Sequence, residues 1–345
     1  MQRFYQIISG QERGTVAVLC RMLLWILSLF YGTAVAVRNF LFDCRFRKIR
    51  RLPIPIISVG NLTLGGTGKT PLVAWLVRHF LEQGHHPGII SRGYGSGSEG
   101  TNDEFQELAF LFPQTPHIQN RNRCAAAESF LAQRNADIFI LDDAFQHRKL
   151  ARSLDIVILD ATVPFGYDYI FPRGTLRESV AGLRRAGIVL LSRADLVSEA
   201  ERERIRQRVL QTAPQVIWGE IAQVPAKLVS VTKTVNALET ITGKTALAFC
   251  GIGNPAAFRR TLERCGVTVK ELRIFPDHHR YTASDLDRLE QDVAVIKPDV
   301  ILCTMKDIVK IDRPLLFDKP VQAVTVETQW LRGKEYVLQR LSDLS

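Results

Sequence analysis

The stretch from Gly60 to Thr70, GNLTLGGTGKT, follows the apolar run 54–59 and decides the fold. A buried strand that leads into a glycine-rich turn, a lysine, a hydroxyl residue and a helix is the layout of a phosphate-binding P-loop. Gly65, Gly66 and Gly68 can adopt the positive φ values that such a turn needs, and they let backbone N–H groups approach phosphates. The turn is therefore predicted to bind a nucleotide.

The residues after the glycines complete this prediction. Lys69 would reach the outer phosphates, and the Thr70 hydroxyl would bind Mg²⁺. Apolar periodicity from Thr70 onward predicts a helix that ends at Gly84 and points its N-terminus at the anion. The strict motif has glycine where this chain has Thr63, so a glycine-rich turn that merely precedes a lysine is the alternative. The predicted nucleotide-binding residues are Gly65, Gly66, Thr67, Gly68, Lys69 and Thr70.

Composition and charge narrow the class of protein. The chain has 345 residues, enough for two domains or one large one. Its six cysteines lie far apart without a CxxC pair, which favours reduced thiols in the cytoplasm over disulfides or a zinc site. Most of the net charge of +10 lies in residues 1–51, which hold nine Lys or Arg. A nucleic-acid-binding face would instead interleave basic and aromatic residues, so no nucleic-acid partner is expected.

Residues 15–37 are apolar, with Arg21 as the single charge. The uninterrupted core, 22–37, is shorter than the ~20 residues that span a bilayer. Three interpretations are open: a signal peptide cleaved after Ala34 to Ala36, a buried core helix, and a helix that spans or lies in a membrane. Export would leave the nucleotide loop outside the cell, and the basic cluster at 45–51 suits anionic lipid on the cytoplasmic side. We favour the membrane helix.

A second apolar run, 136–143 (ADIFILDD), predicts a strand that ends in two carboxylates. Mg²⁺ prefers oxygen ligands, and phosphates alone leave its coordination incomplete. Asp142 and Asp143 point to opposite faces of an extended chain, so one of them is expected nearest the metal together with Thr70. Which of the two it is stays open.

Polar residues at strand ends and in loops are candidates for substrate binding. The strand 88–91 leads into Arg92, at the edge where doubly wound sheets bind ligands, although a surface arginine is equally compatible. A histidine in a polar loop, such as His147, is more often a hydrogen-bonding partner than a catalyst. The candidate substrate-binding residues are Arg92, Gln146, His147, Arg177 and Glu178.

Two further polar clusters have competing interpretations. The spacing of Thr101 and Glu104 predicts a helix capping box, and Asp103 would complement the helix dipole. His278 and His279 follow an aspartate in a turn, where a zinc site lacks a third ligand at standard spacing. A histidine able to orient another carboxylate is the more plausible role.

The predicted fold is α/β: a P-loop NTPase-like, doubly wound sheet, a smaller α/β lobe, and an N-terminal membrane-associated helix. Alternating apolar runs predict strands at 155–160, 187–192 and 216–218 in the first part and at 246–251, 270–275 and 300–304 in the second, with a helix at 256–265. The predicted segments are the N-terminal helix (1–46), the P-loop domain (47–222), a linker (223–241) and the smaller lobe (242–345).

Taken in order, these motifs resemble the tetraacyldisaccharide 4′-kinases of lipid A biosynthesis, from the N-terminal helix to about Lys310. That family itself carries Thr at the position of Thr63. The chain departs from it at Ala144, where glycine is usual, and at Cys303 and Met305, where threonine and glutamate are usual. The motifs that carry the resemblance are Gly60–Pro71, Ser91–Gly95, Asn102–Glu104, Leu141–His147, Leu176–Glu178, Phe275–His279 and Lys306–Asp307.

The resemblance implies transfer of the ATP γ-phosphoryl group to the 4′-hydroxyl of an acylated glucosamine disaccharide 1-phosphate, at the cytoplasmic face of the inner membrane. It implies that Asp103 is the base and pairs with His278. Lys69, Asp142 and Asp143 would complete the catalytic set, with Mg²⁺ and ATP as cofactors. Because His278 is expected on the other lobe, lobe closure would assemble the Asp103 pair. Four acyl chains will not leave the bilayer, so a membrane-seated monomer is expected.

Two other classes compete with this kinase. A membrane-associated P-loop ATPase or GTPase switch would hydrolyse nucleotide independently of added lipid. Ser192 to Asp195, SRAD, resembles a GTPase base-reading motif only loosely. A membrane tether that only binds nucleotide would retain every measurable property after Asp103→Ala.

Overall fold

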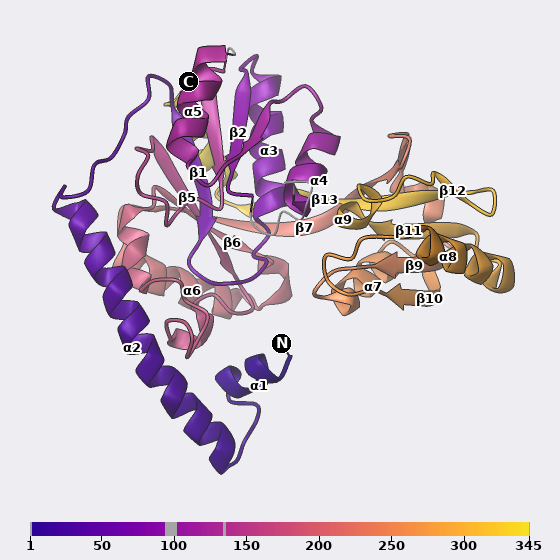
Figure 1. Ribbon diagram of the computed structural model, residues 1–345, viewed down its shortest axis with the longest axis horizontal. Helices are drawn as coiled ribbons and strands as arrows, with labels where there is room; N and C mark the ends of the chain where they lie inside the picture. Colours follow the sequence, from indigo (N-terminus) through magenta and orange to yellow (C-terminus); the bar gives the residue numbers. More distant parts are fainter. Residues whose placement is uncertain (1, 94–101, 134–135, 345) are drawn as a thin grey trace. The chain divides into compact units, whose positions relative to one another are not determined.

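The computed structural model describes residues 2–93, 102–133 and 136–344 (Figure 1). The chain forms two compact units that are not contiguous in sequence. The first unit comprises Met1–Arg92, Thr115–Ala222 and Thr328–Ser345, and the second comprises Gly93–Gln114 and Gln223–Glu327.

The first unit is built on a parallel sheet in the order β7-β6-β5-β1-β4-β2-β3. The central strand β1 is buried throughout, as the continuous apolar run predicts. Helices connect the parallel strands, so the predicted doubly wound α/β sheet is confirmed. The strands are β1 (Ile56–Asn61), β2 (Pro87–Ser91), β3 (His117–Gln119), β4 (Ile138–Asp142), β5 (Leu154–Asp160), β6 (Ile188–Ser192) and β7 (Ile217–Ser230), and the helices are α3 (Lys69–Glu82), α5 (Arg123–Gln133), α6 (Glu199–Thr212) and α10 (Lys334–Ser342).

Helix α3 follows the glycine-rich turn and buries one apolar face against the sheet. Gly68, at φ 86°, precedes it in the left-handed conformation, and Gly84, at φ 83°, follows its end. Both positions favour glycine because a Cβ is strained there. The buried face consists of Leu72, Val73, Ala74, Leu76, Val77 and Phe80. The predicted helix and its end are therefore confirmed.

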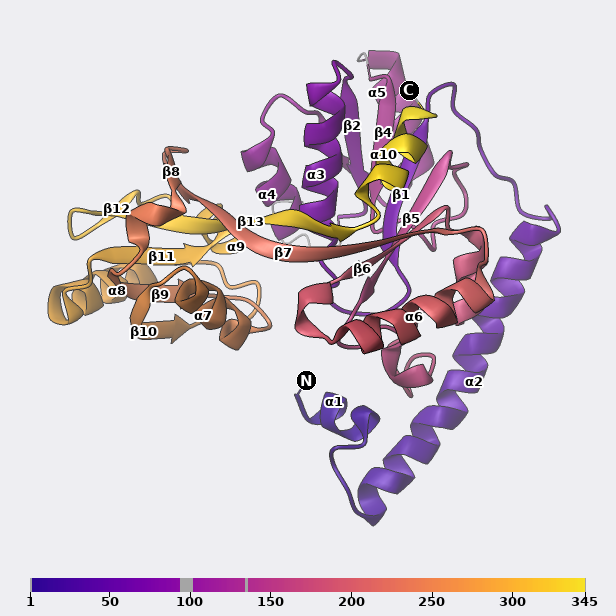
Figure 2. The same ribbon diagram turned by 180° about the vertical axis from the view of Figure 1, so that it is seen from behind.

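The second unit has a smaller parallel sheet in the order β10-β9-β11-β13 (Figure 2). Phe110 and Leu111, at the end of α4, pack against a core cluster that includes Phe249, Leu289 and Ile301. The elements are α4 (Asp103–Leu111), β8 (Val235–Ala237), β9 (Thr245–Cys250), α7 (Pro255–Arg264), β10 (Thr268–Ile274), α8 (Ala283–Ile296), β11 (Val300–Thr304), α9 (Met305–Ile308), β12 (Leu315–Leu316) and β13 (Lys319–Arg332).

The unit boundaries differ from the predicted segments in three places. Residues 223–241 are not a linker, because β7 continues to Ser230 and β8 pairs with it antiparallel. The β-like alternation of this stretch is that of a strand. Residues 93–114 belong to the second unit and 328–345 to the first. The strands β7 and β13 each contain residues of both units.

The N-terminal region holds two helices, α1 (Gln2–Ser9) and α2 (Thr15–Asp43). Helix α2 is long and apolar enough to cross a membrane, with a mean hydropathy of 1.8 in its most apolar window. Only 11% of that window is buried, which rules out the alternative of a buried core helix. Large apolar side chains along it stay exposed, among them Leu19, Met22, Leu23, Phe30 and Phe40.

Helix α2 contacts the rest of the first unit through a few polar and aromatic side chains. The Tyr31 hydroxyl donates to the Arg177 carbonyl (3.2 Å), and its ring meets that of Phe171 edge to face. Asn39 Nδ2 donates to Glu178 Oε2 (2.9 Å). The loop that carries Arg177 and Glu178 is therefore tied directly to the apolar helix.

Candidate active site

The P-loop turn leaves open space above its glycines. Gly65, at φ 109°, and Gly68 have positive φ, whereas Gly66 does not, so the predicted conformation is wrong at Gly66. A Cβ added at Gly65 or Gly66 would meet no atom within 4 Å. Thr63 is buried and forms an antiparallel bridge with Leu176, which is why a β-branched residue fits where the strict motif has glycine.

Backbone carbonyls of the turn accept hydrogen bonds from the last residue of β6 and from the residue after it. Ser192 Oγ donates to the Thr67 carbonyl (2.8 Å), and Arg193 Nη2 donates to the Gly66 carbonyl (2.9 Å). Arg193 also pairs with Asp160. Ser192 and Arg193 therefore hold the backbone of the glycine-rich turn in place. The sequence gives no signal for this role, because the SRAD stretch lies more than 120 residues from the turn.

The turn fits a polyphosphate. The Thr67 side chain is buried, and its hydroxyl has no hydrogen-bond partner among the residues that the structure describes. Helix α3 begins at Lys69, so its unpaired N–H groups lie at the turn. Buried polar groups without partners carry a cost that an anionic ligand would remove.

The carboxylates at the end of β4 lie beside the P-loop lysine. Asp143 adopts φ 47°, and its Oδ1 lies 3.5 Å from Lys69 Nζ and 2.8 Å from Arg177 Nη1. Burial raises the pKa of Asp143, but the charges of Lys69 and Arg177 outweigh it and hold this pKa below its ordinary value. Arg123 Nη2 donates to the carbonyls of Asp142 and Asp143 (2.7 and 3.0 Å). No sequence pattern singled out Arg123.

Three predicted substrate-binding residues, Gln146, Arg177 and Glu178, belong to one hydrogen-bonded network. Gln146 Nε2 donates to the Asn61 carbonyl (2.9 Å) and to Glu178 Oε1 (3.1 Å). Glu178 is 1% exposed, and its other oxygen accepts hydrogen bonds from Asn39 and Arg185. Both Glu178 oxygens are thus occupied by protein groups, and Arg177 contacts Asp143, so this network links helix α2 to the P-loop strand.

The other two candidates lie apart from this network. Burial and neighbouring arginines lower the pKa of His147 to about 4, so its ring is neutral at pH 7. Its Nε2 is buried without a hydrogen-bond partner within the described part of the chain. Arg92 is exposed directly after β2.

Asp103 is the first residue of α4 and meets two basic groups within the second unit. Its Oδ2 accepts a hydrogen bond from Lys310 Nζ (2.7 Å) and lies 2.8 Å from His278 Nδ1. The helix is capped by Asn102, whose side chain accepts from the Phe105 N–H, while the expected cap Thr101 lies outside the described residues. Asp103 and His278 share one unit, so the expectation that lobe closure assembles the pair is wrong.

The charge state of Asp103 follows from these contacts. Burial raises its pKa, but the hydrogen bonds and charges of Lys310 and His278 outweigh burial and bring the pKa below the ordinary value. The carboxylate is therefore ionised at neutral pH. His278 itself has φ 61°, a conformation that is rare for residues with a side chain and common at functional sites.

A buried carboxylate holds the loop of His278. Asp307 is fully buried and accepts hydrogen bonds from the Gly251 N–H (2.9 Å), the Tyr281 hydroxyl (2.9 Å) and the Thr304 hydroxyl (2.5 Å). The His278 N–H in turn donates to the Gly251 carbonyl (3.1 Å). Asp307 thus joins the His278 loop to the start of α9.

Replacing Asp307 with Asn is expected to destabilise the protein by about 3 kcal/mol, because a buried carboxyl group that accepts three hydrogen bonds is exchanged for an amide with one acceptor oxygen. The thermal unfolding midpoint, measured with Asp312→Ala as a matched control on an exposed aspartate, checks this. An unchanged midpoint for Asp307→Asn would contradict the structural role.

The two histidines of the turn have separate partners. His279 Nε2 lies 3.0 Å from Asp285 Oδ2, in the capping box of α8, whereas His278 pairs with Asp103. No group of three or more His, Cys, Asp or Glu side chains that could hold a metal ion occurs among the described residues. The alternative of a zinc site therefore has no support.

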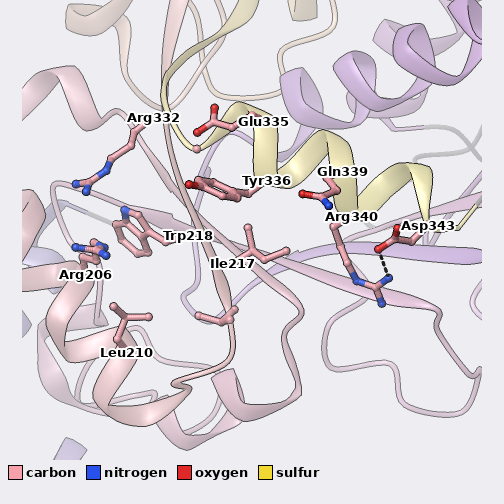
Figure 3. A pocket seen from close by; sticks show the side chains of 12 residues that line it. Arg206, Leu210, Ile217, Trp218, Arg332, Glu335, Tyr336, Gln339, Arg340 and Asp343 are labelled. Carbon is pink, nitrogen blue, oxygen red and sulfur yellow. Dashed lines mark ion pairs between the residues drawn. The ribbon is translucent and has the colours of Figure 1, made fainter.

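A cavity of about 590 Å³ lies elsewhere in the first unit, between α6, β7 and α10 (Figure 3). None of its lining residues is a predicted site residue. Its three arginines, Arg206, Arg332 and Arg340, have carboxylate partners on neighbouring residues. We assign no ligand to this cavity.

Comparison with known proteins identifies the family of this chain. Residues 20–344 match the family described as Tetraacyldisaccharide-1-P 4'-kinase. The chain is 37% identical over 336 residues to the tetraacyldisaccharide 4'-kinase of Chlorobaculum parvum, with 90% of this chain and 91% of that protein covered. It is 34% identical over 338 residues to the enzyme of the same name from Halothermothrix orenii, with 89% and 88% covered.

A solved structure is similar over almost the whole chain. The crystal structure of LpxK from Aquifex aeolicus in complex with ATP superposes with a TM-score of 0.76 at 28% identity, and covers 94% of this chain and 99% of that one. The P-loop, the acidic strand end and the Asp103 pair thus occur in a chain that matches a kinase family over nearly its full length. This protein belongs to the Tetraacyldisaccharide-1-P 4'-kinase family and is a kinase of lipid A biosynthesis.

Proposed function

We propose that this chain binds ATP and transfers its γ-phosphoryl group to the 4′-hydroxyl of a tetraacylated glucosamine disaccharide 1-phosphate, with Asp103 as the base. The observation that carries this assignment is the contact between Asp103 Oδ2 and His278 Nδ1 at 2.8 Å. If Asp103 served only to interact with the dipole at the start of α4, a histidine with the unfavourable positive φ of His278 would not be required beside it.

The P-loop residues bind the nucleotide in this proposal. Backbone N–H groups from Gly65 to Gly68 contact the phosphates, and Lys69 offsets their charge. Thr70 with Asp142 or Asp143 would hold Mg²⁺, which neutralises charge on the phosphates when bound. The ionised Asp143, held between Lys69 and Arg177, supports this part of the proposal.

The chemical step needs positioning more than a strong base. The acceptor oxygen forms a bond to the γ-phosphorus while the bond from that phosphorus to the β–γ bridging oxygen breaks, and ADP leaves. Asp103 takes the hydroxyl proton late in a loose transition state, so a carboxylate of lowered pKa suffices. His278 orients the carboxylate.

Membrane association follows from the substrate and from α2. Each buried methylene is worth about 0.8 kcal/mol, so an acceptor with four acyl chains stays in the bilayer. The exposed apolar side chains of α2 would enter the same bilayer at the cytoplasmic face of the inner membrane. We assign the enzyme to that face as a monomer.

Basic residues after α2 should strengthen binding to anionic lipid. Replacing the exposed Arg45, Arg47, Lys48 and Arg51 with Gln is expected to weaken binding to phosphatidylglycerol-containing vesicles tenfold or more, since each basic residue near such a surface contributes about 1 kcal/mol. Sedimentation with vesicles measures this. Binding to purely zwitterionic vesicles is the control and should change little. Equal binding of both proteins to anionic vesicles would contradict the proposed orientation.

An acceptor-dependent transfer assay tests the function itself. The purified protein should transfer labelled phosphate from ATP to a detergent-solubilised disaccharide 1-phosphate lipid. An analogue that lacks the 4′-hydroxyl is the matched control and should accept none. Nucleotide hydrolysis at the same rate with and without lipid, and no labelled lipid, would favour the ATPase or GTPase switch instead.

A further inference from the structure

We propose that Lys310 is a positioning residue for the base: its ammonium group selects which oxygen of Asp103 takes the proton and keeps that carboxylate ionised. This inference rests on the proposed function, because it assigns a role at the same site. Lys310 lies outside the motif residues from which the site was predicted.

The contact is close and largely removed from solvent. Lys310 Nζ lies 2.7 Å from Asp103 Oδ2, and the two side chains are 8% and 13% exposed. A pair in this environment is weakly screened by water and salt, unlike a surface ion pair. The lysine charge therefore stabilises the ionised carboxylate more than it would in a surface ion pair.

The geometry also distinguishes the two carboxylate oxygens. Lys310 and His278 both meet Oδ2 of Asp103, at 2.7 and 2.8 Å. Asp103 Oδ1 has no hydrogen-bond partner among the described residues. Two contacts on one oxygen fix the rotation of the carboxylate plane, so Oδ1 is left as the atom that accepts a proton.

The other charged groups around Asp103 do not duplicate this effect. Lys306, one turn before Lys310, pairs with Glu104 (3.1 Å) rather than with Asp103. Burial, with the charges of Glu104 and Asp103, raises the pKa of Glu107 to about 7, although Lys306 opposes this. Asp103 thus has acidic neighbours on its own helix, and Lys310 and His278 are the described basic groups that contact it.

Removal of the lysine charge therefore has a definite sign. Burial and the acidic neighbours would both favour the protonated form of Asp103 once Lys310 is neutral. As the pH falls, Asp103 of the variant would then become protonated, and stop acting as a base, at a higher pH than Asp103 of the unaltered enzyme. A role limited to helix packing predicts no such change, because Phe110 and Leu111 already anchor α4 to the core.

The test is the pH dependence of kcat/KM for Lys310→Met in the full-length enzyme. We expect the acidic limb to move to higher pH by about 1 to 2 units, the range that an opposite charge at this distance produces. Lys310→Arg keeps the charge and should restore the limb. Lys306→Met is the matched control, and its limb should stay within about half a unit, since Lys306 contacts Glu104.

A second measurement does not depend on activity. The Asp103 carboxyl carbon can be titrated by NMR in ¹³C-aspartate-labelled protein, with Asp103→Asn to assign the signal. A raised midpoint in Lys310→Met supports the proposal, and an unchanged midpoint together with an unchanged limb overturns it. If Lys310→Met does not fold, the same titration is made on Lys310→Gln. Failure of the base assignment itself would appear differently, as retained kcat in Asp103→Ala.

Discussion

Replacing Asp103 with Ala is expected to lower kcat for phosphate transfer by about 10² to 10⁴, the range that general base catalysis contributes. The KM values for ATP and lipid should change little, because the carboxylate acts on the hydroxyl proton in the transition state rather than in binding. Initial rates of labelled-phosphate transfer at saturating ATP and lipid measure the effect.

Controls separate loss of chemistry from loss of structure. Asp103→Asn keeps the shape and one acceptor oxygen but cannot take the proton at neutral pH, so its kcat should fall as far. Asp312→Ala, at an exposed aspartate of the same unit, should leave kcat unchanged. A kcat for Asp103→Ala within a few-fold of the unaltered enzyme would remove Asp103 as the base and leave its role at the start of α4.

The second large effect is expected for Lys69→Ala, which should reduce kcat by about 10² to 10³, as removal of one preorganised charge from a transition state does. The KM for ATP should also rise, since in the proposed function Lys69 contacts the phosphates of bound ATP before the reaction. Asp143 would lose one of its two cationic partners and keep Arg177 at 2.8 Å. Transfer rates over a range of ATP concentrations give both constants.

Lys149→Ala is the matched control for Lys69, because it removes an exposed lysine from the same unit. Its rates should equal those of the unaltered enzyme. Thermal unfolding of each variant shows whether the fold survives. If Lys69→Ala kept its kcat while its KM for ATP rose, Lys69 would bind the ground state only, and charge stabilisation would have to come from other groups.

Local signals in the sequence sufficed to place the glycine turn and the helix that are proposed to bind phosphate. The strand, the glycine turn, Lys69 and helix α3 lie within about thirty consecutive residues, and all appear where periodicity predicts them. The predicted positive φ is present at Gly65 and Gly68 and absent at Gly66. Open space at a turn permits glycine without requiring it.

The contacts of the proposed base, Asp103, could not be predicted from local sequence. From composition alone Asp103 was better explained as a helix-terminal charge, and the resemblance to a family supplied its pairing with His278. In the structure His278 lies 175 residues away along the chain and Lys310 lies 207 away. Ser192, 125 residues from Thr67, supports the P-loop in the same way. No spacing rule connects residues at such separations.

The sequence by itself determined the class of fold, the position of the nucleotide turn and the apolar character of the N-terminal helix, because each depends on neighbouring residues and their periodicity. Only the tertiary structure decided where α4 packs. The strands before and after it, β2 and β3, belong to the first unit, whereas α4 belongs to the second. There Lys306 and Lys310 pair with the acidic residues of its first turn. The physical reason is that burial and charge pairing between distant segments, rather than local propensity, select which surface a short helix packs against.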